Sequence, residues 1–404
     1  MNNLRILSLF ISVVGLLFFG ACEDFIQDVD PIIDEVENDL LDDAGQFAFL
    51  ANGVRIRFAT AHDLLGVQSD GLSDAFEFDQ SVPNATYPSY DDIDDGTIET
   101  DNNSVDGAYN NLGELRFFAD NLVERADAVE ADAADKDEAY FVGYLYGGIA
   151  RYFYASYFGL EVGGGGGGVI DNGPFIAAAD MYDDAVDKLE AALAYATDEE
   201  ARIINSLIAR IYLFKGEYSN AAGFAVDGMI EGDDPFESQH SPESANQYWQ
   251  QAGIARTQFV VANRFRDYID ADPLEAARIP IDTIRSEQIP DSLRDYQVKY
   301  TTNASPIPVI TWQENELMLA ELALRGQTAA GDALTLVNNV RASHGLADLT
   351  AVDLDVIYEE RDKELFVQGN RLIDQRRFND WHLPAGRWKY LPITNDERNN
   401  NPNI

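Results

Sequence analysis

Cysteine and histidine, the side chains most often used for nucleophilic and metal chemistry, are scarce in this chain. It has one cysteine, Cys22, and four histidines. The histidines His62, His240, His344 and His382 do not form a motif typical of a zinc protease or a catalytic triad. Because the chain has 71 acidic residues, carboxylate pairs suited to glycoside hydrolysis occur by chance. Such pairs in the sequence therefore do not distinguish a glycoside hydrolase from a protein without catalytic activity. The sequence therefore predicts no catalytic residue, no metal site and no cofactor, and we expect a protein that is not an enzyme.

The acidic segment Tyr90–Gly96, with the sequence Y-D-D-I-D-D-G, hints at a calcium loop. If Gly96 were the turn glycine of an EF-hand, position three would be Ile93 and position twelve would be Asn102. Neither side chain fits the oxygen ligands that those positions require. A solvated acidic loop is the favoured interpretation.

The amino terminus has the pattern of an export signal. A single charge is followed by an apolar stretch from Ile6 to Phe19, which is slightly short for a spanning helix, and then by L-F-F-G-A-C ending at Cys22. Small residues immediately before a sole cysteine resemble a lipobox, where bacterial lipoproteins are cleaved and acylated. The alternative is a buried structural cysteine behind an ordinary signal sequence. We expect a signal peptide over 1–21, and a lipidated Cys22 with an extended tether over 22–35.

The charge is strongly one-sided, with 71 acidic and 28 basic residues and a formal net charge of −43. Nucleic acid is an unsuitable partner, because phosphate backbones are bound by clustered Lys and Arg. The acidic surface suits a saline environment, where salt screens the repulsion, and it equally suits simple solubility.

Helical spacing of apolar residues dominates the chain, and 46% hydrophobic residues are enough for a globular core. Residues 36–404 are predicted to form a single all-α domain. The aromatic residues of 138–158 suggest either a binding face or a buried central helix, and the second is favoured because they occupy several faces. The glycine run Gly163–Gly168 is interpreted as a flexible surface loop. Long helices are expected over 36–65, 105–129 and 138–158, helix-pair repeats over about 175–230 and 312–380, and loop-rich regions over about 66–101 and 232–308.

The segment Ala209–Ala221 resembles the helix turn of a tetratricopeptide repeat. Gly216 permits the tight turn, Tyr218 fills the gap between the helices, and Ala221 allows their close approach. A scaffold of such repeats that binds a protein or peptide partner is therefore one hypothesis for the function.

Several further stretches resemble the SusD/RagB family of nutrient-binding lipoproteins. Tyr182–Leu193, Trp312–Gly326 and Leu336–Leu346 match helices of that family, and the ending L-P-I-T-N-D-E-R-N-N-N-P-N-I is close to the family's own. The most specific match is Ile357–Phe378, whose acids and arginines can interlock in ion pairs and are interpreted as structural. The matching positions in it are Glu360, Arg361, Glu364, Gly369, Arg371, Asp374 and Arg377.

The resemblance implies a fold and a function as expectations. The fold is all-α and SusD-like, with tetratricopeptide-type helix pairs and a loop-rich ligand-binding insertion. The function is capture of a nutrient, with oligosaccharide first and peptide next, and its delivery to a SusC-like TonB-dependent transporter. The protein would be lipid-anchored in the outer membrane and exposed at the cell surface. The candidate ligand-binding residues in its loops are Asp70, Tyr87, Tyr90, Tyr248 and Trp249, each of which could instead pin its own loop to the core.

Overall fold

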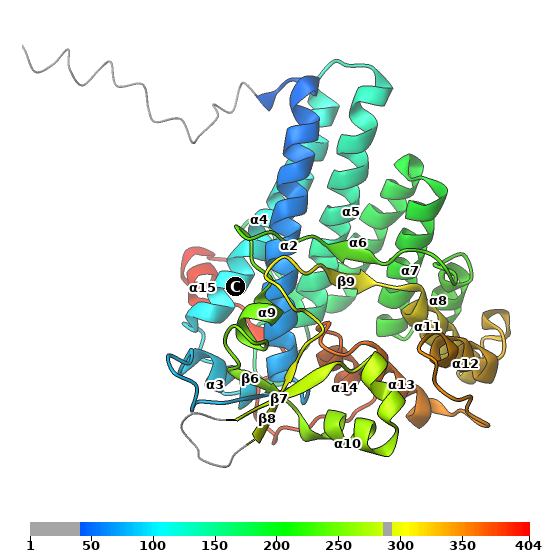
Figure 1. Cartoon of the computed structure of the whole chain (residues 1–404). Helices are drawn as coiled ribbons and strands as arrows, with labels where there is room; N and C mark the ends of the chain where they lie inside the picture. Colours follow the sequence, from blue (N-terminus) through cyan, green and yellow to red (C-terminus); the bar gives the residue numbers. More distant parts are fainter. Residues whose placement is uncertain (1–40, 286–292) are drawn as a thin grey trace, which may run out of the picture.

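The computed structural model describes residues 41–285 and 293–404 (Figure 1). The predicted signal peptide, the acylation site Cys22 and the tether lie outside the described residues. Within the described ranges the chain consists mainly of α-helices, and its short strands form two-stranded pairs. The predicted all-α class is confirmed.

Three long helices, α2, α4 and α5, lie side by side and rise above the rest of the molecule in Figure 1. Helix α5 packs against α2, α4 and α6, and every residue from Leu145 to Tyr157 is buried. The interpretation of this segment as a buried central helix is confirmed. Asn102 starts α4 by accepting hydrogen bonds from the next free N–H groups of the helix. The bounds are η2 Ala44–Gln46, α2 Phe47–Leu72, α4 Asn103–Ala128 and α5 Ala133–Tyr157.

Helix pairs follow, and their ends are specified locally by the sequence. Thr197 and Glu200 form a capping box at the start of α7, which satisfies N–H groups that have no partner inside the helix. Gly216 ends the same helix with φ of +77°, a conformation that glycine adopts without steric cost. The bounds are α6 Ala178–Ala192, η3 Leu193–Tyr195, α7 Asp198–Lys215, α8 Tyr218–Ala225, α11 Trp312–Leu324, η5 Thr328–Ala330 and α12 Ala333–Ser343.

The tetratricopeptide-like turn joins the first group of helix pairs to the second. Ala221 is fully buried, so that α8 packs closely against α7 and α11. The Tyr218 ring lies 4.7 Å below the guanidinium of Arg325, at the end of α11. Gly216 therefore lies at the turn between α7 and α8, and the Tyr218 ring lies against Arg325.

The most specific family-like stretch, Ile357–Phe378, forms two helices rather than one. Val367 and Gly369 both have positive φ, and the chain turns there between α13 and α14. A Cβ on Gly369 would lie 2.9 Å from the Cα of Gly66, so glycine is needed for the close approach to α2. The bounds are α13 Leu354–Glu364, α14 Arg371–Arg377, β10 Leu391–Pro392 and α15 Asn395–Asn400.

Several of the remaining short elements, α3, β6, β7, β8 and α10, lie at the lower end of the molecule in Figure 1, whereas α9 and β9 lie at mid-height beside α2. Strand β1 pairs with β6, β5 pairs with β9, and β7 and β8 form a hairpin. This part contains the loop-rich insertion that the sequence predicts over 232–308. The bounds are β1 Phe76–Phe78, α3 Ser89–Asp94, β2 Phe158–Gly159, β3 Gly167–Gly168, β4 Ile176–Ala177, β5 Phe236–Ser238, α9 Gln247–Gln251, β6 Phe259–Val261, α10 Asn263–Ala271, η4 Pro273–Ala277, β7 Ile281–Arg285, β8 Leu293–Gln297 and β9 Ile307–Ile310.

The first predicted loop begins later than expected. Residues 66–72 belong to helix α2, although their Gly, Ser and Asp content suggested a loop. Gly66 lies directly under the Tyr248 ring, and Gly71 lies under Phe259. Small residues are needed at these points because another element packs onto the helix, so tertiary packing overrides the local preference.

The glycine run is also different from its prediction as a flexible surface loop. Gly166, Gly167 and Gly168 are buried, and the last two form strand β3, which pairs with β4. A Cβ on Gly167 would lie 2.1 Å from the carbonyl oxygen of Ile176. The glycines therefore allow two backbones to approach closely.

Candidate functional site

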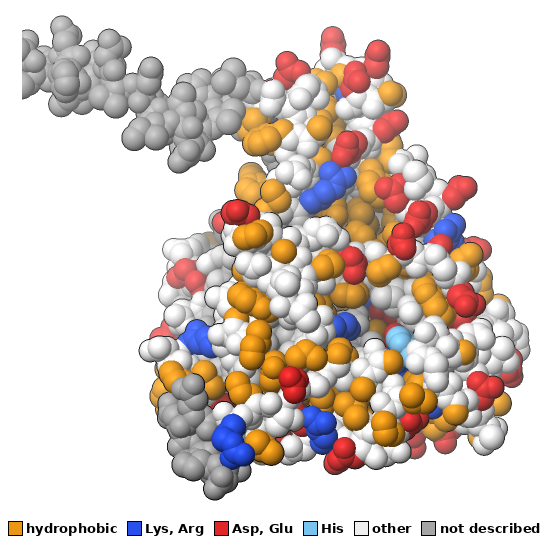
Figure 2. All heavy atoms as spheres, viewed as in Figure 1, with side chains coloured by type: hydrophobic (Ala, Val, Ile, Leu, Met, Phe, Trp, Pro, Cys, Tyr) orange, Lys and Arg blue, Asp and Glu red, His pale blue; other side chains and the backbone are white. Residues whose placement is uncertain are grey.

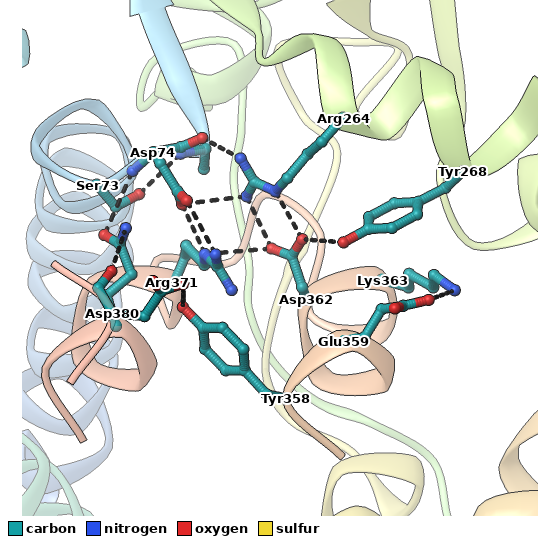
Figure 3. A network of polar contacts seen from close by, with 12 residues as sticks. Ser73, Asp74, Arg264, Tyr268, Tyr358, Glu359, Asp362, Lys363, Arg371 and Asp380 are labelled. Atoms are coloured by element: carbon teal, nitrogen blue, oxygen red, sulfur yellow. Dashed lines mark hydrogen bonds and ion pairs between the residues drawn. The ribbon is translucent and has the colours of Figure 1, made fainter. Parts of the chain in front are cut away.

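The arginines and carboxylates of the family-like motif lie in buried ion pairs that connect several helices. The guanidinium of Arg371 hydrogen-bonds both carboxylate oxygens of Asp74 at 2.6 and 2.9 Å (Figure 3). Arg264 of α10 in the same way holds both oxygens of Asp362 at 2.8 Å. Tyr268 adds a hydrogen bond to Asp362 at 3.3 Å. This network joins the end of α2 to α10, α13 and α14.

The charge of Asp74 is stabilised within that network. Burial by itself raises the pKa of this carboxyl, but the hydrogen bond from Arg371 and the charge of Arg264 outweigh burial and hold the pKa below its ordinary value. Two-pronged arginine–carboxylate pairs of this kind fix orientation as well as charge. The groups in Figure 3 thus face one another rather than a ligand.

A second network lies deeper. Arg361, which is 0% exposed, donates to Asp374 at 2.8 Å. Arg377 donates to Asp374 at 2.8 Å and to Glu321 of α11 at 2.9 Å. Burial raises the pKa of Asp374, but the two guanidinium groups more than offset this and keep the pKa below its ordinary value. Most of these partners come from different elements rather than from successive turns of one helix.

The remaining acids of the motif are paired as well. Glu360 lies 2.7 Å from Arg341 of α12 and 2.8 Å from Arg278 after η4. Glu364 lies 2.9 Å from the imidazole of His344. These motif residues therefore contact other parts of the chain.

A different kind of site lies where the two loop-rich regions meet. It is a pocket of about 240 Å³ with walls from three segments: the loop after β1, the turn between α9 and β6, and the β7–β8 hairpin. In Figure 2, basic and hydrophobic side chains adjoin at the lower edge of the face, where Figure 1 places β7 and β8. Its apolar lining comes from Val82, Pro83, Ile254 and Ile284.

The charged lining of this loop pocket is mainly basic. Arg256, Arg285 and Arg294 line it together with one carboxylate, Asp79, and both Arg285 and Arg294 already interact with other groups of the chain. Arg294 donates to Asp79 at 3.2 Å, and the Asp79 carboxylate also accepts from the N–H of Ser81 at 2.9 Å. Asp79 is 8% exposed, and its partly buried hydrogen bonds connect the loop after β1 to Arg294 of β8.

Two other hollows differ from the loop pocket in their charges, and one lies among the helix pairs while the other lies between the insertion 232–308 and the helices α11 and α13. One, of about 440 Å³, is lined by Lys215 and Arg377 among others. Lys215 is paired with Glu217 at 2.8 Å, and Arg377 belongs to the network around Asp374. Lys215 and Arg377 are thus engaged by carboxylates of the chain, and Arg376, which also lines the hollow, donates to the carbonyl oxygens of Lys389 and Ser156.

The other hollow, of about 260 Å³, is lined by Trp312, Lys299 and Glu364. Burial lowers the pKa of Lys299 to about 8, and its ammonium group donates to the carbonyl oxygen of Phe366 at 2.9 Å. Positive and negative groups alternate around this hollow, so it has no excess of either sign to offer a ligand.

Two further findings concern the described residues alone. Residues 41–285 and 293–404 hold no group of three or more His, Cys, Asp or Glu placed to bind a metal ion. Over the same ranges, every helix is too short or too polar to cross a membrane.

Comparison with known proteins gives a clear result at the level of structure. No family model and no curated protein matches the sequence. A SusD superfamily protein from Bacteroides thetaiotaomicron superimposes with a TM-score of 0.71 at 16% identity, covering 89% of this chain and 98% of that chain. The chain has the SusD-like fold.

Other structures with the SusD-like fold agree over nearly the same length. A protein described as a laminarin-binding SusD-like protein has a TM-score of 0.67 at 14% identity, covering 88% of this chain and 97% of that one. Surface glycan-binding protein A from Bacteroides thetaiotaomicron has a TM-score of 0.64 at 14% identity, covering 88% and 96%. At these identities the likeness establishes the fold.

Three of the five predicted ligand-binding residues are in the interior of the SusD-like fold. Asp70 is 1% exposed, and it accepts hydrogen bonds from Tyr248 at 2.7 Å and from the N–H of Gly369 at 3.1 Å. Tyr248 is 0% exposed and Tyr90 is 5% exposed, with its ring stacked on Phe259. The prediction that these residues lie in exposed loops is wrong. The Tyr248 side chain packs against α2, where it donates to Asp70, and the Tyr90 ring packs against β6.

The other two predicted residues, Tyr87 and Trp249, remain accessible. Tyr87 is 57% exposed in the loop that also supplies Val82 and Pro83 to the pocket, and Trp249 is half-buried on α9. The sequence reasoning missed Arg256, Arg285 and Arg294, because it searched the loops for aromatic rings. A search for arginines in loops of a strongly acidic chain is the signal that could have found them.

Proposed function

We propose that this protein is a lipid-anchored outer-membrane protein that captures an oligosaccharide and delivers it to a SusC-like TonB-dependent transporter. The loop pocket of Asp79, Arg256, Arg285 and Arg294 is the proposed point of contact with the sugar. No bond is made or broken in this function, and we assign no catalytic residue.

The observation that carries the proposal is the position of the pocket. It lies outside the helix pairs and is built from both loop-rich regions, on a fold shared with proteins whose names describe laminarin and surface-glycan binding. Its volume of about 240 Å³ is below the roughly 300–1,000 Å³ of sites that bury a whole drug-sized ligand. One sugar unit of a longer chain therefore suits it, with the rest of the oligosaccharide lying across the open surface.

The proposals of a lipid anchor and of a transporter partner are based on the sequence. Acyl chains on Cys22 gain about 0.8 kcal/mol per buried methylene, so several chains together give stable membrane attachment. A tether of this kind would keep the protein beside a partner in the same membrane at high effective concentration. A Cys22→Ser variant should lose membrane attachment in cell fractionation, and normal cleavage and membrane retention of that variant would contradict the anchor.

The central experiment is a binding measurement with a panel of neutral oligosaccharides, acidic oligosaccharides and peptides, using the full chain extracted in detergent. We expect binding to at least one oligosaccharide. Binding to peptides alone would favour the peptide-binding scaffold, and binding to nothing in the panel, with or without the SusC-like transporter, would refute nutrient capture.

A further inference from the structure

We propose that the protein binds a neutral sugar unit in a second pocket, separate from the loop pocket, through hydrogen bonds to the hydroxyl groups of the sugar. This α11 pocket is the hollow of about 260 Å³ lined by Trp312, Lys299 and Glu364. The inference rests on the proposed function, because it gives the captured oligosaccharide another site of contact.

The α11 pocket is built from the insertion and from two helices. Trp312 begins α11, Glu364 ends α13, and Lys299 follows strand β8. Pro280 and Lys299 flank the β7–β8 hairpin beside the Ile281–Gln297 pair, which is the hairpin end opposite to the gap in the described residues. The charges that line the pocket are therefore counted from described side chains.

One polar group of the lining lacks a partner in the described part of the chain. Gln368 is 5% exposed, and its amide nitrogen donates to the carbonyl oxygen of Glu364 at 3.3 Å. Its amide oxygen accepts no hydrogen bond from any described residue. A buried oxygen without a donor is unfavourable, so a ligand that donates a hydrogen bond at this wall would be stabilised.

A second polar group of the lining has donors to spare. The Lys299 ammonium carries three N–H groups, and within the described ranges its hydrogen bond goes to the carbonyl oxygen of Phe366 at 2.9 Å. The carboxylates of Glu364, Asp70 and Glu237 act on its charge through space rather than by hydrogen bonds. A ligand at this wall is therefore expected to accept a hydrogen bond.

A hydroxyl group satisfies both walls of the pocket. Because a hydroxyl donates and accepts, neighbouring hydroxyls of a sugar ring can donate to Gln368 and accept from Lys299. A carboxylate or sulfate has no donor for the Gln368 oxygen and would meet the negative charge of Glu364. A cation has no acceptor for Lys299 and would meet its positive charge. The pocket therefore favours a neutral polyhydroxy ligand.

The remaining lining suits the apolar face of a sugar ring. Trp312 is 8% exposed, and Pro235, Pro280 and Pro308 add aliphatic surface. Small-molecule sites commonly combine such apolar surface with a few placed polar groups. At about 260 Å³ the pocket is below the roughly 300–1,000 Å³ of sites that bury a whole drug-sized ligand, so it suits one sugar unit.

The first experiment identifies the class of ligand by titration calorimetry on the full chain in detergent. The probes are neutral trisaccharides of glucose, mannose, galactose and N-acetylglucosamine, each compared with its uronate or amino-sugar counterpart. We expect at least one neutral trisaccharide to bind about tenfold or more tightly than its charged counterpart, because the added charge would lose its hydration beside a group of like charge.

A pocket-filling variant locates the site. Gln313 is half-buried and lines the α11 pocket, so Gln313→Trp places an indole in it. Binding of the neutral trisaccharide should weaken about tenfold or more, because both hydrogen bonds to the sugar are blocked. Gln327→Trp is the matched control, since Gln327 is also half-buried, lies beyond the other end of α11 and does not line the pocket. It should bind as the wild type does.

A second variant tests the ammonium group itself. Lys299→Met removes the charged donor and should weaken binding of the neutral trisaccharide about 10- to 100-fold. Thermal melting of Lys299→Met and Gln313→Trp shows whether each chain is folded at the temperature of the titration. Wild-type affinity in a folded Lys299→Met chain would overturn the assigned contact.

The outcomes separate this inference from the proposed function. Equal or tighter binding of the charged counterparts would overturn the neutral class of ligand. Oligosaccharide binding that is weakened by Arg256→Gln but unchanged by Gln313→Trp would overturn the α11 pocket and leave oligosaccharide capture intact. Equal losses in Gln313→Trp and Gln327→Trp would also overturn the site. Failure to bind any oligosaccharide would refute the proposed function itself.

Discussion

The buried networks of α13 and α14 and the loop pocket both contain three or more arginines, in different surroundings. In the networks, Arg361, Arg371 and Arg377 each meet a carboxylate of another part of the chain at 2.9 Å or less. In the pocket, Arg256 lies at an open surface beside aliphatic groups. Arg361, Arg371 and Arg377 join helices through their carboxylate partners, whereas Arg256 lies at the pocket without a carboxylate partner among the described residues.

This comparison predicts opposite consequences for the loss of one guanidinium group. In the buried networks we expect the free energy of unfolding to fall, because a carboxylate is left without its partner in a region that excludes water. At the pocket the cost is expected in ligand affinity, because solvent replaces the missing group.

The largest effect is expected for Arg361→Met. Its removal leaves Asp374 with Arg377 alone and removes the positive charge that lies 3.7 Å from Glu314. We expect a loss of about 3–5 kcal/mol in the free energy of unfolding, measured by urea denaturation. Adding Asp374→Asn to the same chain should recover part of the loss, because the uncompensated charge is then absent. A loss below about 1 kcal/mol would show that the network is not structural.

The second effect is a pH dependence that arises from Asp70. Burial raises the pKa of Asp70 from 3.8 to about 7, although hydrogen bonds from Tyr248 and Gly369 oppose the rise. The folded state therefore keeps a proton that the unfolded chain releases near pH 4. Stability from this group is fully present below pH 3.8 and is lost as the pH rises toward 7.

An Asp70→Asn variant tests this sign directly. The amide stays neutral and retains an oxygen that can accept the hydrogen bonds from Tyr248 and Gly369. Between pH 4 and pH 8 the wild type should lose up to about 4 kcal/mol relative to the variant, at about 1.36 kcal/mol per pKa unit. Thermal melting of both chains across this range measures the difference. A wild type that gains stability over the variant as the pH rises would contradict the buried neutral carboxyl.

The smallest effect on stability is expected for Arg256→Gln. Because the side chain is half-buried at a pocket, we expect the free energy of unfolding to change by less than about 0.5 kcal/mol. Urea denaturation of both Arg256→Gln and Arg361→Met measures the two changes in the free energy of unfolding under the same conditions. A loss as large as that of Arg361→Met would show that Arg256 belongs to the framework, and the comparison between the two regions would fail.

The fold was largely predictable because its signals are local. Helix α7 begins at the capping box of Thr197 and Glu200 and ends at Gly216, and these signals involve contacts within a few residues. The spacing of apolar residues predicted the helices themselves. The same local reasoning failed for residues 66–72 and for Gly166–Gly168. In both places glycine is needed because a residue distant in sequence, Tyr248, Phe259 or Ile176, packs closely against the backbone.

The candidate ligand site was less predictable, for a related reason. The sequence does not distinguish an exposed aromatic residue from a buried one in these regions. Tyr87 is 57% exposed, whereas Tyr248 is 0% exposed. Exposure depends on whether another element covers the ring. Three of the five residues predicted to bind a ligand, Asp70, Tyr90 and Tyr248, are therefore buried.

The sequence by itself determined the helical class, the ends of several helices and the excess of negative charge, because these depend on neighbouring residues or on composition. The tertiary structure decided which carboxylate each arginine meets. Arg371 meets Asp74 across 297 positions of the chain, and Arg294 meets Asp79 across 215. Contacts over such separations form only when distant segments pack together, so neighbouring residues in the sequence cannot specify them.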